Sequence, residues 1–298
     1  MNDTPTAGKL AAAGRLAKQT FKDWSDDKAP RLGAALSYYT IFSLAPVLLM
    51  VISIAGLAFG RDAAQGKLVD ELRGLMGAEG AAIVQTMLAK ASNRASGILS
   101  AVVGFATLLI GATGVLIELQ GALNTVWKVE PRPGGTIKTL VRERLLSFGL
   151  ILVFGFLLLV SLVLSAALAG MGNMLSRFIP GWVILGYVLN YVVSLAVITT
   201  LIAMIYKILP DARMAWSDVW IGALVTSILF QVGKFLIGLY VGKAGVGSPF
   251  GAAGSLAVLL VWIYYSSQVI LLGAEFTHVW ATHHGSHAPP GGAAAHGP

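Results

Sequence analysis

Three ionisable side chains interrupt long apolar runs of the sequence and are its clearest candidates for chemistry. Glu118, Lys234 and Glu275 each lie within a run long enough to cross a membrane. An ionised side chain in such a segment is costly, and it usually faces the protein interior or a water-filled cavity. We therefore interpret the three as markers of a path for a substrate or an ion. Glu118 and Glu275 are expected near one membrane face and Lys234 near the other, so a direct Glu–Lys pair is not assured.

Uncharged polar side chains accompany these three at helical spacing. Residues four, seven or eleven apart share a face of a helix, as do Tyr39, Ser43 and Pro46 in one run and Tyr264, Gln268 and Glu275 in another. The alternative is that single hydroxyl groups only hydrogen-bond neighbouring helices together. The full set of path candidates is Tyr39, Ser43, Pro46, Glu118, Gln120, Asn124, Gln231, Lys234, Tyr264, Gln268 and Glu275.

Motifs of catalysis and cofactor binding are missing from the sequence. H-E-x-x-H, G-x-S-x-G and the phosphate-loop pattern do not occur, and the Gly-rich stretch 242–251 lacks the required order. Glu275 and His278 form one isolated Glu-x-x-His, whereas a di-iron bundle needs two such pairs and further carboxylates. There is no cysteine. We therefore predict no enzyme, no cofactor and no resident metal; metal on the terminal histidines would be adventitious.

The composition explains where these polar groups must lie. Of the 298 residues, 56% are hydrophobic and 12% charged, against about 25% charged in a soluble domain. Too few charges remain to cover a soluble surface, and disorder requires low hydrophobicity instead. The chain is therefore expected to be an all-α polytopic membrane protein.

Six segments satisfy the requirement of about 20 mostly apolar residues for a spanning helix. Tryptophans stand at several of their ends, as expected at a membrane interface. The six predicted spans are 33–59, 97–126, 145–168, 183–208, 216–239 and 252–280.

The distribution of positive charge predicts orientation. Twelve Lys and Arg lie outside the spans on the side of the two termini, and seven lie on the other side. The positive-inside rule then places both termini in the cytoplasm, as for a multi-pass protein of a bacterial inner membrane. The net charge of +7 is interpreted as orientation and attraction to anionic lipid, and nucleic acid is not expected as a partner.

The segments outside the hydrocarbon have their own patterns. Residues 1–32 form a cytoplasmic N-terminal segment, in which 9–24 reads as an amphipathic helix with an apolar stripe. That helix either lies on anionic lipid or packs on the cytoplasmic face of the protein itself. The segment 60–96 is predicted to be a periplasmic helical hairpin, broken at 77–80, that acts as a structural cap or, alternatively, a lid. The Gly-, Pro- and His-rich tail 282–298 is expected to be disordered.

Three motifs resemble one bacterial family. The run RLGAALSYYTIFSLAP at 31–46, the run ALNTVW at 122–127 and the run ending LGAEF at 272–276 resemble the YihY/BrkB family of inner-membrane proteins, over about residues 20–281. The resemblance implies six membrane helices within a domain covering about 33–281. Members are described as transporters or virulence-associated factors, and the older label ribonuclease BN is usually regarded as mistaken. The resemblance implies no agreed substrate and no catalytic residues.

We predict from these observations a transporter or exporter of an anionic small molecule or a lipid. Two alternatives stay open, a non-transporting envelope scaffold and, with less support, the tRNA-processing ribonuclease of the older label. Membrane lipids are the expected partners, and a homo-oligomer is compatible with the sequence. Substrate, direction of transport and coupling ion are not determined by it.

Overall fold

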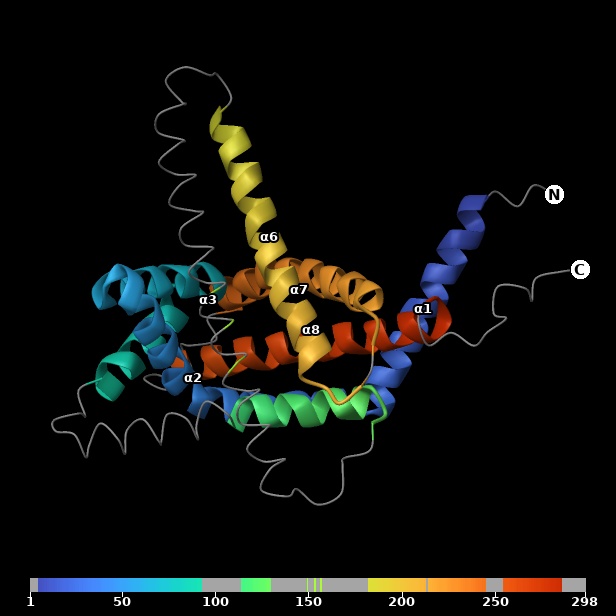
Figure 1. The fold of residues 1–298 in the computed structure, drawn as a ribbon, viewed down its shortest axis with the longest axis horizontal. Helices are drawn as coiled ribbons and strands as arrows, with labels where there is room; N and C mark the ends of the chain where they lie inside the picture. Colours follow the sequence, from blue (N-terminus) through green and yellow to red (C-terminus); the bar gives the residue numbers. More distant parts are fainter. Residues whose placement is uncertain are drawn as a thin grey trace, which may run out of the picture.

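The described part of the chain is entirely helical. The computed structural model describes residues 5–92, 114–129, 182–212, 214–244 and 254–285, together with residues 149, 153 and 156. A helix without a label covers 114–126. The labelled helices are α1 (Pro5–Asp26), α2 (Ala29–Phe59), α3 (Arg61–Ser92), α6 (Trp182–Ile208), α7 (Trp216–Ala244) and α8 (Gly254–His283) (Figure 1).

Four of the helices are long and apolar enough to cross a membrane. Their spanning segments are Ala29–Ser53, Tyr191–Ile208, Trp216–Leu236 and Leu256–His283. They confirm the first, fourth, fifth and sixth predicted spans as apolar helices. The second predicted span is described only at 114–126, which is helical, and the third, at 145–168, has only residues 149, 153 and 156 among the described residues. The number of spans and the sidedness therefore remain predictions.

Local sequence explains how α2 starts and ends. Lys28 has φ 55° in the left-handed region and separates α1 from α2, and a proline stands in the first turn of α2, where its missing N–H costs no helical hydrogen bond. Pro46 lies inside the helix without ending it. Gly60 ends the helix with φ 83°, a conformation that glycine adopts at little cost.

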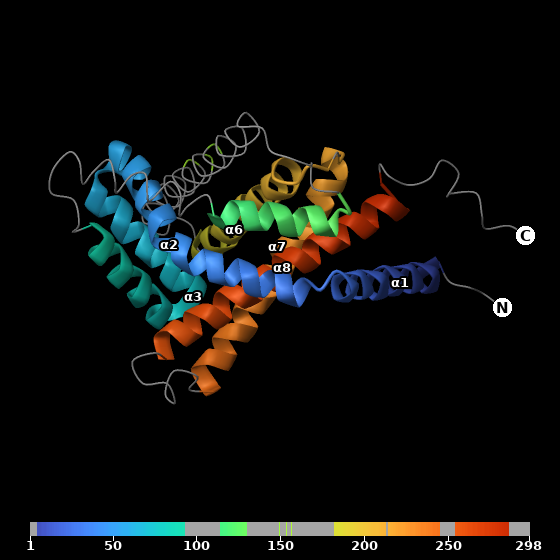
Figure 2. The ribbon, with the colours of Figure 1, turned by 90° about the horizontal axis from the view of Figure 1, so that it is seen from below.

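α8 is the central helix of the arrangement. It packs against α1, α2, α3 and α7, and α6 packs on α7 and crosses it steeply in Figure 1. Turned by 90°, Figure 2 shows α8 crossing α2 obliquely, with the helix 114–126 next to the crossing and α1 continuing beyond the end where α2 begins. We call this end, which carries the α1–α2 joint and the C-terminus of α8, the α1 end.

Glycines set the distance between α7 and α8. A Cβ at Gly222 would lie 1.8 Å from the hydroxyl oxygen of Thr277, and one at Gly273 would lie 1.9 Å from that of Thr226. In lipid the hydrophobic effect does not drive helices together, so association depends on van der Waals packing between closely approaching backbones. The pair Gly222 and Thr226, a small-xxx-small pattern in the sequence, therefore forms a contact surface for α8.

The predicted helical hairpin at 60–96 is described as α3, which is assigned as helix without interruption from Arg61 to Ser92. Its glycines do not interrupt that assignment, because each costs a helix only about 1 kcal/mol, and the two halves of α3 turn back beside each other in Figure 1. The predicted stripes of the two halves both become core: Leu68 and Leu72, and then Val84 and Leu88, are buried in one cluster with α2 and α8.

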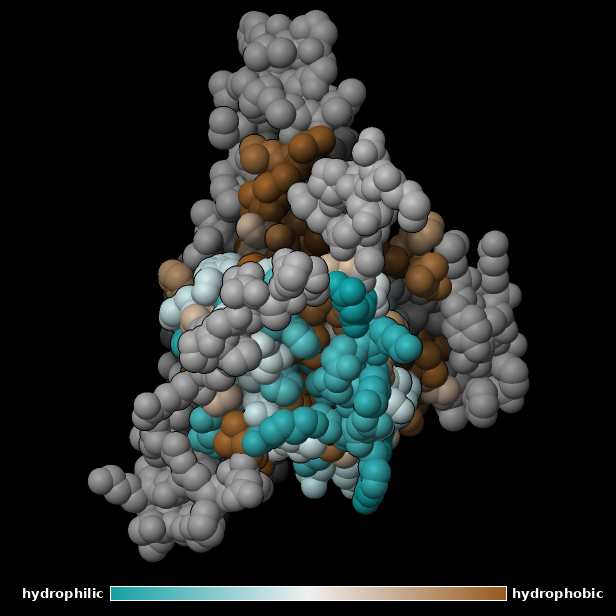
Figure 3. Space-filling model, turned by 90° about the vertical axis from the view of Figure 1, so that its right-hand side faces the viewer, coloured by the Kyte–Doolittle hydropathy of each residue, from teal (hydrophilic) through white to brown (hydrophobic). Residues whose placement is uncertain are grey.

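The N-terminal amphipathic helix is confirmed as α1, and part of it packs on the protein itself. Thr20 is buried, Trp24 packs against the main apolar cluster, and α1 contacts α8. Ala13, Ala17 and Phe21 of the predicted stripe remain exposed. Viewed toward the α1 end, hydrophilic residues gather at the centre of the described surface and hydrophobic ones lie toward its margins (Figure 3).

We predict that Gly222→Ala lowers stability by about 1–3 kcal/mol, because the added methyl group meets the buried, hydrogen-bonded side chain of Thr277. The measurement is thermal unfolding of the purified full chain in detergent. Gly121→Ala is the matched control, since a Cβ there meets nothing within 4 Å, and it should leave the melting temperature unchanged or raise it. Equal destabilisation by both changes would contradict this role of Gly222.

Candidate functional site

Glu275 is the most deeply buried charged residue that the structure describes. Its relative exposure is 0%, and neither carboxylate oxygen has a hydrogen bond from another described residue. The charged groups that act on it are Asp27, Lys128 and Asp23. We call Glu275, Asp27 and Lys128 the carboxylate cluster.

The carboxylate cluster combines three separate elements at the α1 end. Glu275 comes from α8, Asp27 from the α1–α2 joint and Lys128 from the residues after the helix 114–126. The ammonium group of Lys128 donates a hydrogen bond to Oδ1 of Asp27. Two neighbouring carboxylates repel each other unless a cation or a proton accompanies them, so the position of Lys128 controls the electrostatic balance of the site.

The backbone holds both partners of Glu275 in unusual turns. Lys28, directly after Asp27, and Lys128 are the described non-glycine residues with positive φ, 55° and 53°. Lys128 N–H bonds to the carbonyl of Thr125 and Val129 N–H to that of Asn124, which is the Schellman pattern of a helix C-terminus. Left-handed conformation costs a non-glycine residue about 1–2 kcal/mol, and such strain is often kept at functional sites.

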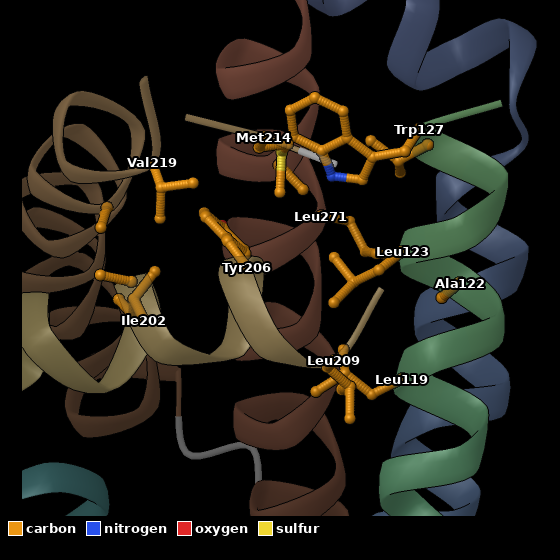
Figure 4. Close-up of a cluster of buried hydrophobic side chains, with 14 of the residues drawn as sticks. Leu119, Ala122, Leu123, Trp127, Ile202, Tyr206, Leu209, Met214, Val219 and Leu271 are labelled. Carbon is orange, nitrogen blue, oxygen red and sulfur yellow. The ribbon is translucent and has the colours of Figure 1, made fainter. Parts of the chain in front are cut away.

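Two tryptophans stand next to the cluster in the sequence, Trp24 three residues before Asp27 and Trp127 directly before Lys128. The ring N–H groups of Trp24 and Trp127 are buried without a hydrogen-bond acceptor among the described residues. The ring of Trp127 packs edge-on against His278, with centroids 5.1 Å apart. In Figure 4, Trp127 reaches from the end of the helix 114–126 toward Met214, and Leu123, Leu271 and Tyr206 fill the space beside it.

Asn124 connects the same helix end to the loop between α6 and α7. Its side-chain oxygen accepts the backbone N–H of Asp211 at 2.9 Å, and its side-chain nitrogen donates to Oδ2 of Asp211 at 3.1 Å. Gln120 adds a longer contact of 3.4 Å to the same oxygen. These two predicted path residues therefore hold the helix 114–126 to the neighbouring loop.

Gln268 shares a face of α8 with Glu275, as the sequence predicts. It donates to the carbonyl of Ala29 at 3.4 Å, and its amide group lies where a Cβ of Gly33 would be. Its oxygen is buried without a described donor. The start of α2 is therefore lined by unsatisfied polar groups from α8.

The remaining predicted residues near α2 lie further from the α1 end, and Tyr39 among them is 42% exposed. Ser43 is buried, and Tyr39 and Ser43 both face Gly114, one turn before Glu118. Ala29 and Tyr39 are ten residues apart on α2, which is about 15 Å. Glu118 is half-buried and is not among the groups acting on Glu275. Pro46 is half-buried one turn further along α2.

Lys234 lies far from the carboxylate cluster. Its neighbour Gly233 faces Tyr265 of α8, and Tyr265 is ten residues, about 15 Å, before Glu275. Lys234 and Gln231 are half-buried and Tyr264 is 37% exposed. The predicted path residues thus fall into two groups, one at the α1 end and one near the opposite end of α7, with Tyr39, Ser43 and Glu118 between them.

Sequence analysis missed three charged residues of this region. It counted Lys128 only among the loop cations and gave Asp27 and Asp211 no role, because all three lie just outside the apolar runs. Their position within three residues of a helix end was the available signal. Lys207 is similar: at the end of α6 it donates to the carbonyl of Met214 and lies 5.6 Å from the ring centroid of Trp216.

The charged groups of the site are two carboxyl groups and the one ammonium group that balances them. Among the described residues there is no group of three or more His, Asp or Glu side chains that could hold a metal ion. Two carboxyl groups and one ammonium group suit the recognition or release of a charged species. Long apolar helices joined at a polar end by such groups define the chain as a polytopic helical membrane protein.

The chain belongs to the family described as "Virulence factor BrkB", whose family model matches residues 20–297. This confirms the family resemblance that the motifs at 31–46, 122–127 and 272–276 indicated.

Curated relatives carry the same class of name. The chain is 30% identical over 259 residues to a UPF0761 membrane protein of Verminephrobacter eiseniae, covering 84% of this chain and 59% of the relative. It is 29% identical to one from Ralstonia nicotianae, covering 89% and 58%, and 30% identical to one from Pseudomonas aeruginosa, covering 83% and 58%. The chain thus spans about three fifths of the length of these relatives. No solved structure matches it.

We predict that Asn124→Ala destabilises the protein by about 1–3 kcal/mol, because it leaves the backbone N–H and carboxylate of Asp211 without this partner. The measurement is the melting temperature in detergent. Thr125→Ala, at an exposed neighbour bonded only to its own helix, should change it little. An unchanged melting temperature for Asn124→Ala would show that the loop is held in another way.

Proposed function

We propose that this protein transports an anionic small molecule or an anionic lipid across a bacterial inner membrane, with both termini in the cytoplasm. The observation that carries the proposal is Glu275, an ionisable group with no exposed surface inside a helix suited to cross the membrane. A chain gains nothing in stability from such a group, because desolvation can exceed the attraction to its partner. A functional role is the simpler explanation.

The contacts of Lys128 support an anionic substrate. Lys128 is about half exposed while Asp27 is nearly buried, with side-chain exposures of 52% and 11%. An anion arriving at the α1 end can therefore reach Lys128 before it reaches either carboxylate. When the anion binds Lys128, Asp27 and Glu275 lose their shared cation, and their repulsion opens the α1–α2 joint away from α8.

Alternating access needs helices that can separate at such a joint. The joint is short, two residues between α1 and α2, and the positive φ of Lys28 stores strain that opening can release. The unsatisfied oxygen of Gln268 and the hydroxyl of Ser43 continue a polar line from the joint toward Glu118. These groups form the first part of the proposed path.

We predict that Glu275→Gln lowers transport at least tenfold and leaves the melting temperature unchanged or higher, because it removes the repulsion but preserves shape. Transport is measured in proteoliposomes as efflux of carboxyfluorescein and as translocation of fluorescently labelled phosphatidylglycerol. Asp70→Asn, the same chemical change at an exposed position of α3, is the control and should have no effect.

The same assay separates the alternatives. If neither probe moves, or if Gln at positions 118, 234 and 275 leaves both rates unchanged, the path is not used and a non-transporting envelope scaffold becomes the better explanation. Cleavage of tRNA by the purified protein, abolished by Glu275→Gln, would instead support the ribonuclease alternative.

A further inference from the structure

A basic groove runs between α1 and the C-terminal end of α8, beside the carboxylate cluster but separate from it. It has a volume of about 600 Å³ and is lined by Arg15, Lys18, Gln19 and Lys22 of α1 and by His283 and His284. Arg15, Lys18 and Lys22 share one face of α1, since they are three, four and seven residues apart. No acidic residue lines the groove among the residues described there.

The cationic groups of the groove are not neutralised by the described part of the protein. The ion pairs found there, Arg73 with Asp70 and Lys128 with Asp27, include none of the three α1 cations, which are all exposed. Asp23, one turn from Gln19, accepts a hydrogen bond of 2.8 Å from its side-chain amide. The groove therefore concentrates positive charge that an external anion can balance.

The histidines are held in place by aromatic stacking. His284 lies parallel to the ring of Trp280, with centroids 4.8 Å apart and an interplanar angle of 18°, and Trp280 stacks on Phe276. A fixed imidazole offers a ring N–H donor in a defined direction. The groove thus combines the exposed guanidinium and ammonium groups of α1 with an oriented donor, His284, directly after α8.

The position of the groove indicates which anion it meets. The spanning segment of α8 ends at His283, so the two histidines stand where the chain leaves the hydrocarbon, at the level of lipid headgroups. Tryptophan is typical of this level. Basic clusters immediately next to a span bind anionic phospholipid, at about 1 kcal/mol for each Lys or Arg.

We propose that the groove between α1 and α8 is a binding site for the phosphate-bearing headgroup of an anionic phospholipid. Arg15, Lys18 and Lys22 neutralise the headgroup, and His283 and His284 donate hydrogen bonds to its phosphate oxygens. The site anchors α1, and through it the α1–α2 joint, to the membrane surface. This proposal does not depend on the proposed transport function, because headgroup binding is measured without any transport step.

The test measures binding of dioctanoyl phosphatidylglycerol to the full chain in non-ionic detergent by titration calorimetry. The triple change Arg15→Gln, Lys18→Gln and Lys22→Gln should weaken binding on the order of a hundredfold without changing the melting temperature, since all three side chains are exposed. The double change His283→Gln and His284→Gln should weaken it about two- to tenfold.

The matched control removes the same charge elsewhere, by Arg61→Gln, Arg73→Gln and Lys90→Gln at exposed positions of α3, and should leave the affinity within about twofold. Equal losses in both triple variants, or no loss in the α1 variant, would overturn the site. Inorganic phosphate or glycerol phosphate binding as tightly as the lipid would assign the groove to soluble phosphate compounds and overturn the lipid assignment. Equal binding of dioctanoyl phosphatidylcholine would do the same.

Discussion

A carboxylate enclosed by apolar helices needs a compensating charge close by, and in this protein the requirement is met by bringing three chain segments together. Glu275 on α8 is fully buried, and the groups that act on it come from the α1–α2 joint and from the end of the helix 114–126. Because Lys128 is paired with Asp27, the two carboxyl groups depend on one cation. The α1–α2 joint and the end of the helix 114–126 therefore lie together, because Lys128 must stay next to Asp27 and Glu275.

Helix packing supplies the rigidity that this arrangement requires. Gly222 and Gly273 bring α7 and α8 into close contact, and the fully buried Tyr206 of α6 donates from its hydroxyl to the carbonyl of Ile270 at 2.6 Å on the same surface of α8. Close contacts of this kind hold membrane helices where the hydrophobic effect cannot. α8 therefore serves as the fixed element of the proposed opening at the joint between α1 and α2.

α1 meets different environments along its circumference. Thr20 is buried against the protein, Lys18 lines the basic groove, and Phe21, three residues after Lys18, is 60% exposed. α1 therefore contacts both the helix bundle and the basic groove. A change in how α1 binds the membrane would act on the carboxylate cluster, because Asp27 directly follows α1.

The sequence by itself determined the membrane class, the helical fold and four of the spans. A helix that crosses the hydrocarbon needs a long apolar run, and such runs can be read directly from the sequence. It also identified Glu275, whose charge stands out in such a run. Only the tertiary structure decided its partners. Asp27 and Lys128 lie in loops whose sequence carries no sign of depth. They meet because the residues before α2 and those after the helix 114–126 pack at the same end of α8. The packing of both halves of α3 against α2 and α8 was likewise decided by the tertiary structure, since such contacts are set between helices and not within one.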